Sequence, residues 1–196
     1  AAAVRGLGIN YQAGKTEAIL KLAGVGARSV KHKVWHECGG YLPVVTEYGT
    51  QQLRTAHSYK HLGSYVQDHA IVQKDVRHRI SQARKAYGQL SRQFYNKRNV
   101  SQPTKGSVFS ALVMSRLLYN VHTWSWLTDA DVECWENGIK PQVAALAKQK
   151  IRPVPPFQFS TAELCAIAGL HSPSDLLHAN RLRYVRRAIS TAPTAL

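Results

Sequence analysis

The chain has 196 residues and is strongly basic, with 26 lysine and arginine residues against 11 aspartate and glutamate residues and a net charge of +15. A hydrophobic fraction of 44% supports a packed core and excludes a disordered chain. No apolar run reaches the roughly 18 residues of a membrane-spanning helix. Three widely spaced cysteines form no disulfide framework, which predicts a reducing location in the nucleus or cytoplasm. The charge excess favours nucleic acid as a partner.

Residues 1–72 predict a strand-rich segment, because they combine glycine with β-branched and aromatic residues in short extended stretches. A short helix is expected before the strands, at 14–23. The predicted strands are 29–35, 41–47, 52–56 and 59–66. Helices dominate the rest of the chain. This order of strands followed by helices predicts an α+β fold rather than an alternating α/β fold.

The clearest predicted helix covers residues 73–96, which span about 35 Å at about 1.5 Å per residue. Its apolar residues recur at spacings of three and four, which indicates one buried stripe. The stripe consists of Val76, Ile80, Ala83, Tyr87, Leu90 and Phe94. Cations lie on or beside the opposite face of this helix. They are Lys74, Arg77, Arg84, Lys85 and Arg92.

Two further helices are predicted in the middle of the chain. The first begins at the N-cap Ser101, with Pro103 in its first turn. Its buried side is expected to carry Val108, Leu112, Leu117 and Val121. The second begins at Thr128, and Pro141 is expected to kink or end it. Acidic residues at its start complement the helix dipole. They are Asp129, Asp131 and Glu133.

The last part of the chain opens with a proline-rich stretch at 152–156, which predicts a stiff linker. Ser160 and Glu163 form a capping box for a short helix that Gly169 should end. The final helix starts at 172–175. Its apolar side carries Leu176, Leu182, Val185 and Ile189. Its polar side carries Arg181, Arg183, Arg186 and Arg187.

Three motifs that suggest chemistry have simpler explanations. Gly14-Lys15-Thr16 lacks the glycine that a P-loop needs five residues before its second glycine. Two pairs of histidines offer zinc ligands, but in the extended segments predicted for them residues four apart are about 13 Å apart. These pairs are His32 with His36 and His57 with His61. The acidic residues after Thr128 are explained by helix capping, so the sequence predicts no complete active site.

Short segments in a fixed order carry a resemblance. Gly6-Leu7-Gly8-Ile9-Asn10 is followed by Lys15-Thr16-Glu17, and later by Tyr59-Lys60-His61-Leu62-Gly63. The first two resemble the palm segment that follows the catalytic strands in reverse transcriptases of non-LTR (LINE-type) retrotransposons. The third resembles the Tyr-Leu-Gly turn of that family's primer grip. The insert at 23–47 is longer than is typical of the family.

The resemblance continues through the helical part of the chain. Residues 79–86 and 115–124, which end in Thr123-Trp124, are similar to the family's thumb helices. Residues 162–170 and 180–185 resemble the segment beyond the thumb. The resemblance thus implies the end of a palm at 1–72, a helical thumb at 73–150, and a linker with post-thumb helices at 151–196.

The resemblance also implies roles for matched residues. Lys15 falls where a palm lysine lies near the incoming nucleotide and would assist proton transfer to the leaving pyrophosphate. Tyr59, Leu62 and Gly63 fall at the primer grip. The family's catalytic Tyr-any-Asp-Asp motif would precede residue 1. The resemblance therefore implies Mg²⁺ for the full-length polymerase. This fragment is expected to hold no cofactor and to be inactive alone.

The expected function is binding of a primer–template duplex by a basic thumb, within an RNA-directed DNA polymerase of a mobile element. The expected partners are RNA, DNA and the missing N-terminal part of the polymerase, with no membrane. The cations expected to bind nucleic acid are Lys74, Arg77, Arg84, Lys85, Arg92, Arg181, Arg183, Arg186 and Arg187. Two alternatives stay open, a stand-alone basic nucleic-acid-binding module and an inert retroelement remnant.

Overall fold

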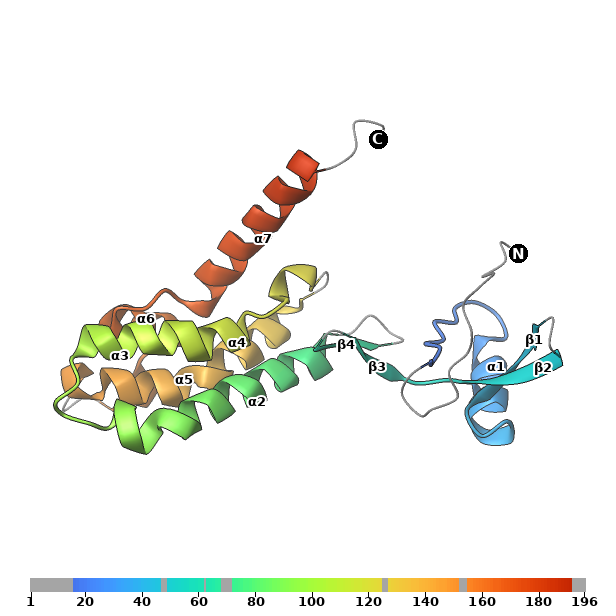
Figure 1. Ribbon diagram of the computed structural model, residues 1–196, viewed down its shortest axis with the longest axis horizontal. Coiled ribbons are helices and arrows are strands. Elements are labelled where there is room, and N and C mark those ends of the chain that lie inside the picture. Colours follow the sequence, from blue (N-terminus) through green and yellow to red (C-terminus); the bar gives the residue numbers. More distant parts are fainter. Residues whose placement is uncertain are drawn as a thin grey trace. The chain divides into compact units, whose positions relative to one another are not determined.

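A computed structural model describes residues 16–46, 49–61, 63–67, 72–124, 127–151 and 155–191. The chain divides into two compact units, Ala1–Ile71 and Val72–Leu196 (Figure 1). Small antiparallel sheets in the first and helices in the second make an α+β fold, as predicted. In the described part of the chain, no helix is long and apolar enough to cross a membrane.

The first unit begins with a helix where a strand was predicted. Helix α1 (Ala27–His32) continues into the π-helical turn η1 (Lys33–Glu37), so the strand predicted at 29–35 is wrong. The alternation of Val30 and Val34 with basic residues can be explained equally well by a helical spacing of four, and Val34 is the buried residue of the two. The same spacing stacks the rings of His32 and His36 at 4.7 Å, so their predicted extended separation is also wrong.

The helix predicted at 14–23 is absent from the described residues 16–23. Ala18 instead forms an isolated parallel bridge with Thr55, donating its N–H to the Arg54 carbonyl at 2.9 Å. Glu17 lies 3.5 Å from the guanidinium of Arg54. A helix this short is marginal by itself, so pairing with a neighbouring segment overrides its local preference.

Two hairpins complete the first unit. Strand β1 (Tyr41–Thr46) pairs with β2 (Gly49–Arg54), which confirms the two central predicted strands to within a few residues. The strand predicted at 59–66 is a hairpin of β3 (Ser58–His61) and β4 (Ser64–Gln67), with His61 opposite Ser64. Gly63 in its turn has φ 83°, a left-handed conformation that favours glycine.

The second unit is helical, and Figure 1 shows α2, α3 with α4, and α5 running alongside one another. Helix α2 covers Gln73–Leu90 and continues into the π-helical turn η2 (Ser91–Tyr95). The elements that follow are α3 (Gln102–Phe109), the π-helical turn η3 (Ser110–Met114), α4 (Ser115–Leu117), η4 (Val121–Thr123), α5 (Asp129–Ile151), η5 (Pro156–Gln158), α6 (Thr161–Ala168) and α7 (Pro173–Thr191).

The core of this unit forms around α5. Trp135, Ile139 and Val143 of α5 are fully buried, together with Phe109 and Leu164 from α3 and α6. The stripe predicted on α2 faces this core as expected. Its first three members are buried and its last three are half-buried against the same cluster. Burial of one side of α2 leaves its opposite side to solvent.

For the helix predicted to begin at Ser101, the structure confirms only part of the expected buried side. Leu117 and Val121 are buried, but Leu112 is 40% exposed, so its predicted burial is wrong. Phe109 and Val113 are buried in its place. The reason is the turn η3, whose i→i+5 hydrogen bonds widen the helix and keep residues spaced by four on one face.

Side-chain caps start three helices where the sequence predicts them. The Ser101 hydroxyl accepts from the Thr104 N–H at 3.3 Å, and Thr128 exchanges bonds with Asp131. Ser160 and Glu163 form the predicted capping box, and Gly169 ends α6 with φ 74°. Bonds from Ser160 lower the pKa of the exposed Glu163 carboxyl. These caps supply partners for backbone N–H groups that a helix leaves open.

Pro141 does not end α5, which continues through it to Ile151. Of the two effects predicted for Pro141, a kink or a helix end, the helix end is therefore wrong. Residues on either side, Ile139 and Val143, are fully buried. Burial of these neighbours offsets the lost hydrogen bond that a proline causes within a helix.

Gly138 sets the distance between α2 and α5. A Cβ atom at this position would lie 2.6 Å from the Ile80 Cδ1 and Cγ1 atoms. The Ile80 side chain is buried and β-branched, so it cannot turn away easily. Glycine is thus required here for close contact between the helices rather than for its backbone conformation.

We predict that Gly138→Ala lowers the free energy of unfolding by about 1–2 kcal/mol, because overpacking outweighs the gain in helix propensity. The matched control is Gly88→Ala in α2, where a Cβ meets no atom within 4 Å. That variant should gain about 0.5–1 kcal/mol. Urea unfolding of both variants measures the difference, and equal effects would contradict the close contact.

Cys165 is a further probe of the packing. It is fully buried, and burial, followed by the charges of Glu136 and Asp175, raises the pKa of its thiol to about 12. Cys38 and Cys134 are exposed. We predict that a thiol reagent labels those two in the native chain near neutral pH and labels Cys165 only after unfolding. Mass spectrometry counts the labels, and rapid native labelling of Cys165 would contradict the packing of α6.

Candidate nucleic-acid interface

The exposed side of α2 is a basic face. Lys74, Arg77 and Lys85 are exposed on the side away from the core, and the exposed Arg84 lies beside them toward α5. We call these four residues the α2 basic face. Arg92 is also exposed, in the turn η2 that follows. The structure thus places all five cations predicted on this helix at the surface.

The α2 basic face has no exposed acid beside it in the sequence. Residues 76–128 contain no aspartate or glutamate. Asp75, the one acid within α2, is 2% exposed and faces the interior. The exposed charge of this helix is therefore of one sign, which raises the local potential for an anion.

Arg84 is held in place by α5. Its Nε donates to the Gly138 carbonyl at 2.7 Å, close to the point where the two helices meet. This bond restricts the orientations that the other two guanidinium nitrogens can adopt. A cation fixed in this way loses less side-chain entropy when it binds a phosphate.

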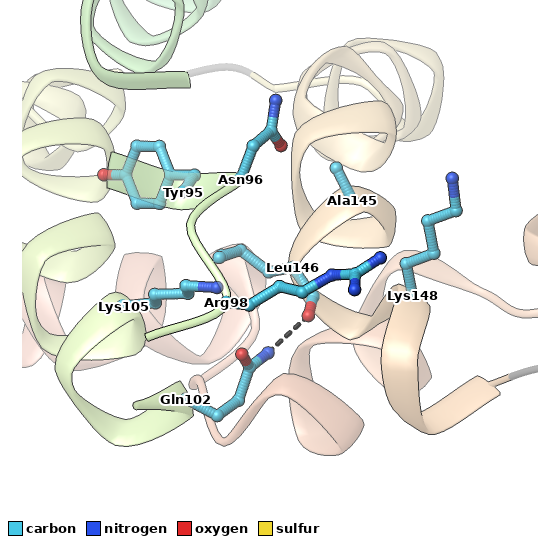
Figure 2. A pocket seen from close by; sticks show the side chains of 8 residues that line it. All are labelled: Tyr95, Asn96, Arg98, Gln102, Lys105, Ala145, Leu146 and Lys148. Atoms are coloured by element: carbon cyan, nitrogen blue, oxygen red, sulfur yellow. Dashed lines mark hydrogen bonds between the residues drawn. The ribbon is translucent and has the colours of Figure 1, made fainter. Parts of the chain in front are cut away.

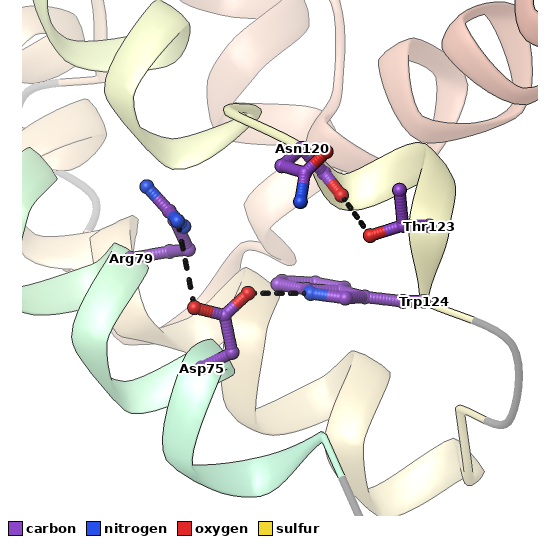
Figure 3. Close-up of polar contacts among 5 residues, drawn as sticks. All are labelled: Asp75, Arg79, Asn120, Thr123 and Trp124. Atoms are coloured by element: carbon purple, nitrogen blue, oxygen red, sulfur yellow. Dashed lines mark hydrogen bonds and ion pairs between the residues drawn. The ribbon is translucent and has the colours of Figure 1, made fainter. Parts of the chain in front are cut away.

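Asp75 links α2 to the segment around Trp124 in the second unit. Its carboxylate accepts from the indole Nε1 of Trp124 at 2.8 Å and lies 3.5 Å from the guanidinium of Arg79, as Figure 3 shows. The Arg79 guanidinium in turn lies 4.6 Å from the centre of the Tyr119 ring. Both members of the ion pair are almost fully buried, so each depends on the other for compensation.

The same network reaches α7 through Arg181. The carbonyl of Trp124 accepts a hydrogen bond from Arg181 Nη2 at 2.7 Å, and the rings of His122 and Tyr184 lie 4.7 Å apart. Arg181, predicted to contact nucleic acid, is half-buried and makes this contact. The other three predicted cations of α7 are exposed. They are Arg183, Arg186 and Arg187.

The predicted apolar side of α7 is largely uncovered. Leu176 is half-buried, and Leu177 is the buried leucine of this helix. Leu182 and Ile189 are each 72% exposed, and Val185 is 51% exposed. The buried residues of α7 therefore lie near its start, and farther along Arg181 and Tyr184 contact the segment of His122 and Trp124.

The residues matched to the palm and primer grip belong to the first unit. Lys15 and Leu62 lie outside the described residues. Tyr59 is half-buried in β3 opposite Val66, and Gly63 lies in the turn after it. The structure thus places the described residues matched to the primer grip, Tyr59 and Gly63, in a hairpin.

No metal site is found in the part of the chain that the structure describes, where no three His, Cys, Asp or Glu side chains come together. Asp131 is buried and bonded to Thr128, so helix capping explains it. His57 stacks on Trp35 with ring centres 3.9 Å apart.

Sequence reasoning missed one basic cluster. Arg98, Lys105 and Lys148 line a single pocket of the second unit. A signal for it was present in α3, because Lys105 falls four residues before Phe109 on an otherwise apolar buried stripe. Lysine is seldom found at such a buried position.

Comparison with known proteins adds no identification. The chain matches no family model, no curated protein and no solved structure. The fold and the arrangement of charges define it as an α+β chain whose helical unit presents a basic surface.

We predict that Asp75→Asn lowers the free energy of unfolding by about 3 kcal/mol. Asparagine can still accept from Trp124, but Arg79 then stays buried without its counter-charge. The control is Asp129→Asn, an exposed acid at the start of α5, which should cost less than about 1 kcal/mol. Chemical denaturation measures both, and a cost at Asp75 no larger than at Asp129 would contradict the network.

Proposed function

We propose that this chain binds the sugar–phosphate backbone of a primer–template duplex through the α2 basic face, as the thumb of an RNA-directed DNA polymerase of a mobile element. The observation that carries the binding part is the exposed row of cations on α2, in a stretch without surface acids. The polymerase part rests on the resemblance to non-LTR reverse transcriptases.

The geometry of α2 suits a backbone rather than a base sequence. The helix presents Lys74 and Arg77 near its start and Arg84 and Lys85 farther along, on one side. At about 1.5 Å per residue the row extends over roughly 15 Å, enough to meet several phosphates of one strand. Contacts of this kind position a duplex and carry no sequence information.

The chain's own contribution to polymerisation would be positioning. No adjacent pair of aspartates occurs in the sequence, so the Tyr-any-Asp-Asp motif that holds two Mg²⁺ ions in the family has no counterpart here. The proposed role is to hold the duplex while another segment of the polymerase supplies those carboxylates. Lys15, Tyr59 and Gly63 would act with that segment.

A second candidate is a stand-alone nucleic-acid-binding module. The observation that favours it is the separate core of the unit Val72–Leu196, which contains both α2 and α7. This module would bind nucleic acid through the same cations, and it differs only in lacking a polymerase partner. Addition of the rest of the polymerase would stimulate DNA synthesis under the first proposal and not under the second.

We predict that Lys85→Glu with Arg92→Glu weakens binding to RNA–DNA hybrids of unrelated sequence to the same extent. Loss of two phosphate contacts should reduce the slope of log affinity against log salt by about 2. Fluorescence anisotropy with labelled hybrids, over about 50–200 mM salt, measures the slope.

The control carries the same change of charge in the first unit. Arg28→Glu with Lys33→Glu alters two exposed cations of α1 and η1. This variant should lower affinity only slightly and leave the slope within about 0.5 of the original. A slope that is unchanged in the Lys85/Arg92 variant, or reduced equally in both variants, would rule out binding through the α2 basic face and the adjoining Arg92.

A further inference from the structure

A basic pocket lies between the turn after η2, the start of α3 and the last turns of α5. Its volume is about 360 Å³. Arg98 from the turn, Lys105 from α3 and Lys148 from α5 line it, together with Asn96 and Gln102. Figure 2 shows Lys105 and Arg98 extending toward α5, where Lys148 lies. No carboxylate lines the pocket.

Lys105 is the unusual member of this set. It is 5% exposed, so most of its side chain is buried. A lysine can bury its apolar stem and keep its ammonium group where water or an anion reaches it. The pocket is the open side from which an anion could reach it.

The rest of the lining is fixed in shape. The Tyr95 ring stacks on Tyr87 with centres 4.7 Å apart and meets Phe109 edge-on, so one wall belongs to the packed core. The Gln102 amide donates to the carbonyl of Leu146 and ties α3 to α5 at the pocket (Figure 2). The cations therefore project from a rigid frame, which lowers the entropy cost of binding.

The chemistry of the pocket selects its ligand class. Three cations and an amide provide donors, and an arginine fork with lysine ammonium groups matches the oxygens of a phosphate. The volume is at the lower end for ligand sites, so it suits a phosphate with its attached sugar rather than a large cofactor. Two sources offer this group, a nucleic-acid strand and a free nucleotide or inorganic phosphate.

We propose that the pocket of Arg98, Lys105 and Lys148 binds a phosphate group, and that on the full chain this is a backbone phosphate of the bound strand. The assignment to a backbone phosphate rests on the proposed function, whereas phosphate binding by the pocket does not. Lys105 would form the inner contact, and Arg98 and Lys148 would close the exposed side. The strand contact would then add a buried point of attachment to the exposed row on α2.

The test compares Lys105→Met with Lys85→Met on the full chain. Methionine keeps the apolar stem of Lys105, so this variant should fold and should unfold at no lower a temperature. Calorimetric titration with inorganic phosphate and with adenosine monophosphate, at constant ionic strength, tests the pocket. Anisotropy with an RNA–DNA hybrid tests the strand.

We expect Lys105→Met and Arg98→Gln each to weaken phosphate and nucleotide binding about tenfold, and to weaken hybrid binding to a similar degree. Lys85→Met should weaken hybrid binding alone. Loss of nucleotide binding with intact hybrid binding would support the pocket and assign it to free phosphates. Unchanged binding of all three probes in both pocket variants would overturn the proposal. If the Lys85→Glu/Arg92→Glu variant leaves hybrid binding unchanged, the proposed function fails but the test of the pocket still stands. Binding of inorganic phosphate to the pocket does not involve the α2 basic face.

Discussion

The helical unit depends on one buried carboxylate. Asp75 accepts from the indole of Trp124 and compensates the guanidinium of Arg79, and the Trp124 carbonyl then holds Arg181 of α7. Three segments far apart in the sequence are thereby joined at one point. Such a network is sensitive to loss of any member, since a buried charge without its partner is strongly unfavourable.

The use of Asp75 inside the unit has a result at the surface. Because Asp75, the one acid of α2, is buried, the charged side chains on the exposed side of the helix are all cations. The apolar stripe and the cations are thus separated on opposite sides of a single helix. The same residues that form the core contact, Ile80 against Gly138, place Arg84 where α5 can hold it.

Local signals in the sequence were sufficient for most of the helical unit. The spacing of Val76, Ile80 and Ala83 identified the buried side of α2, and Ser160 with Glu163 identified the start of α6. These features depend on residues within a few positions of each other. Leu112 was misplaced because the π-helical turn before α4 changes the spacing, and no local pattern marks it.

Predictions failed where distant segments decide the structure. Ala18 pairs with the segment around Thr55, and a pattern of alternating residues at 29–35 concealed a helix. The candidate site shows the same limit. Exposed cations on α2 could be found from periodicity, whereas the cluster of Arg98, Lys105 and Lys148 needs the packing of α3 on α5.

The end of α7 carries one more consequence. Beyond Arg181 the described residues of this helix are all exposed, including Leu182 and Ile189. Apart from the ring contact of Tyr184 with His122 this segment is exposed, and a helical segment this short receives little support from its own backbone bonds. Amide protons should therefore exchange progressively faster from Leu177 toward Thr191, and α7 should fray from its C-terminus while its base stays ordered.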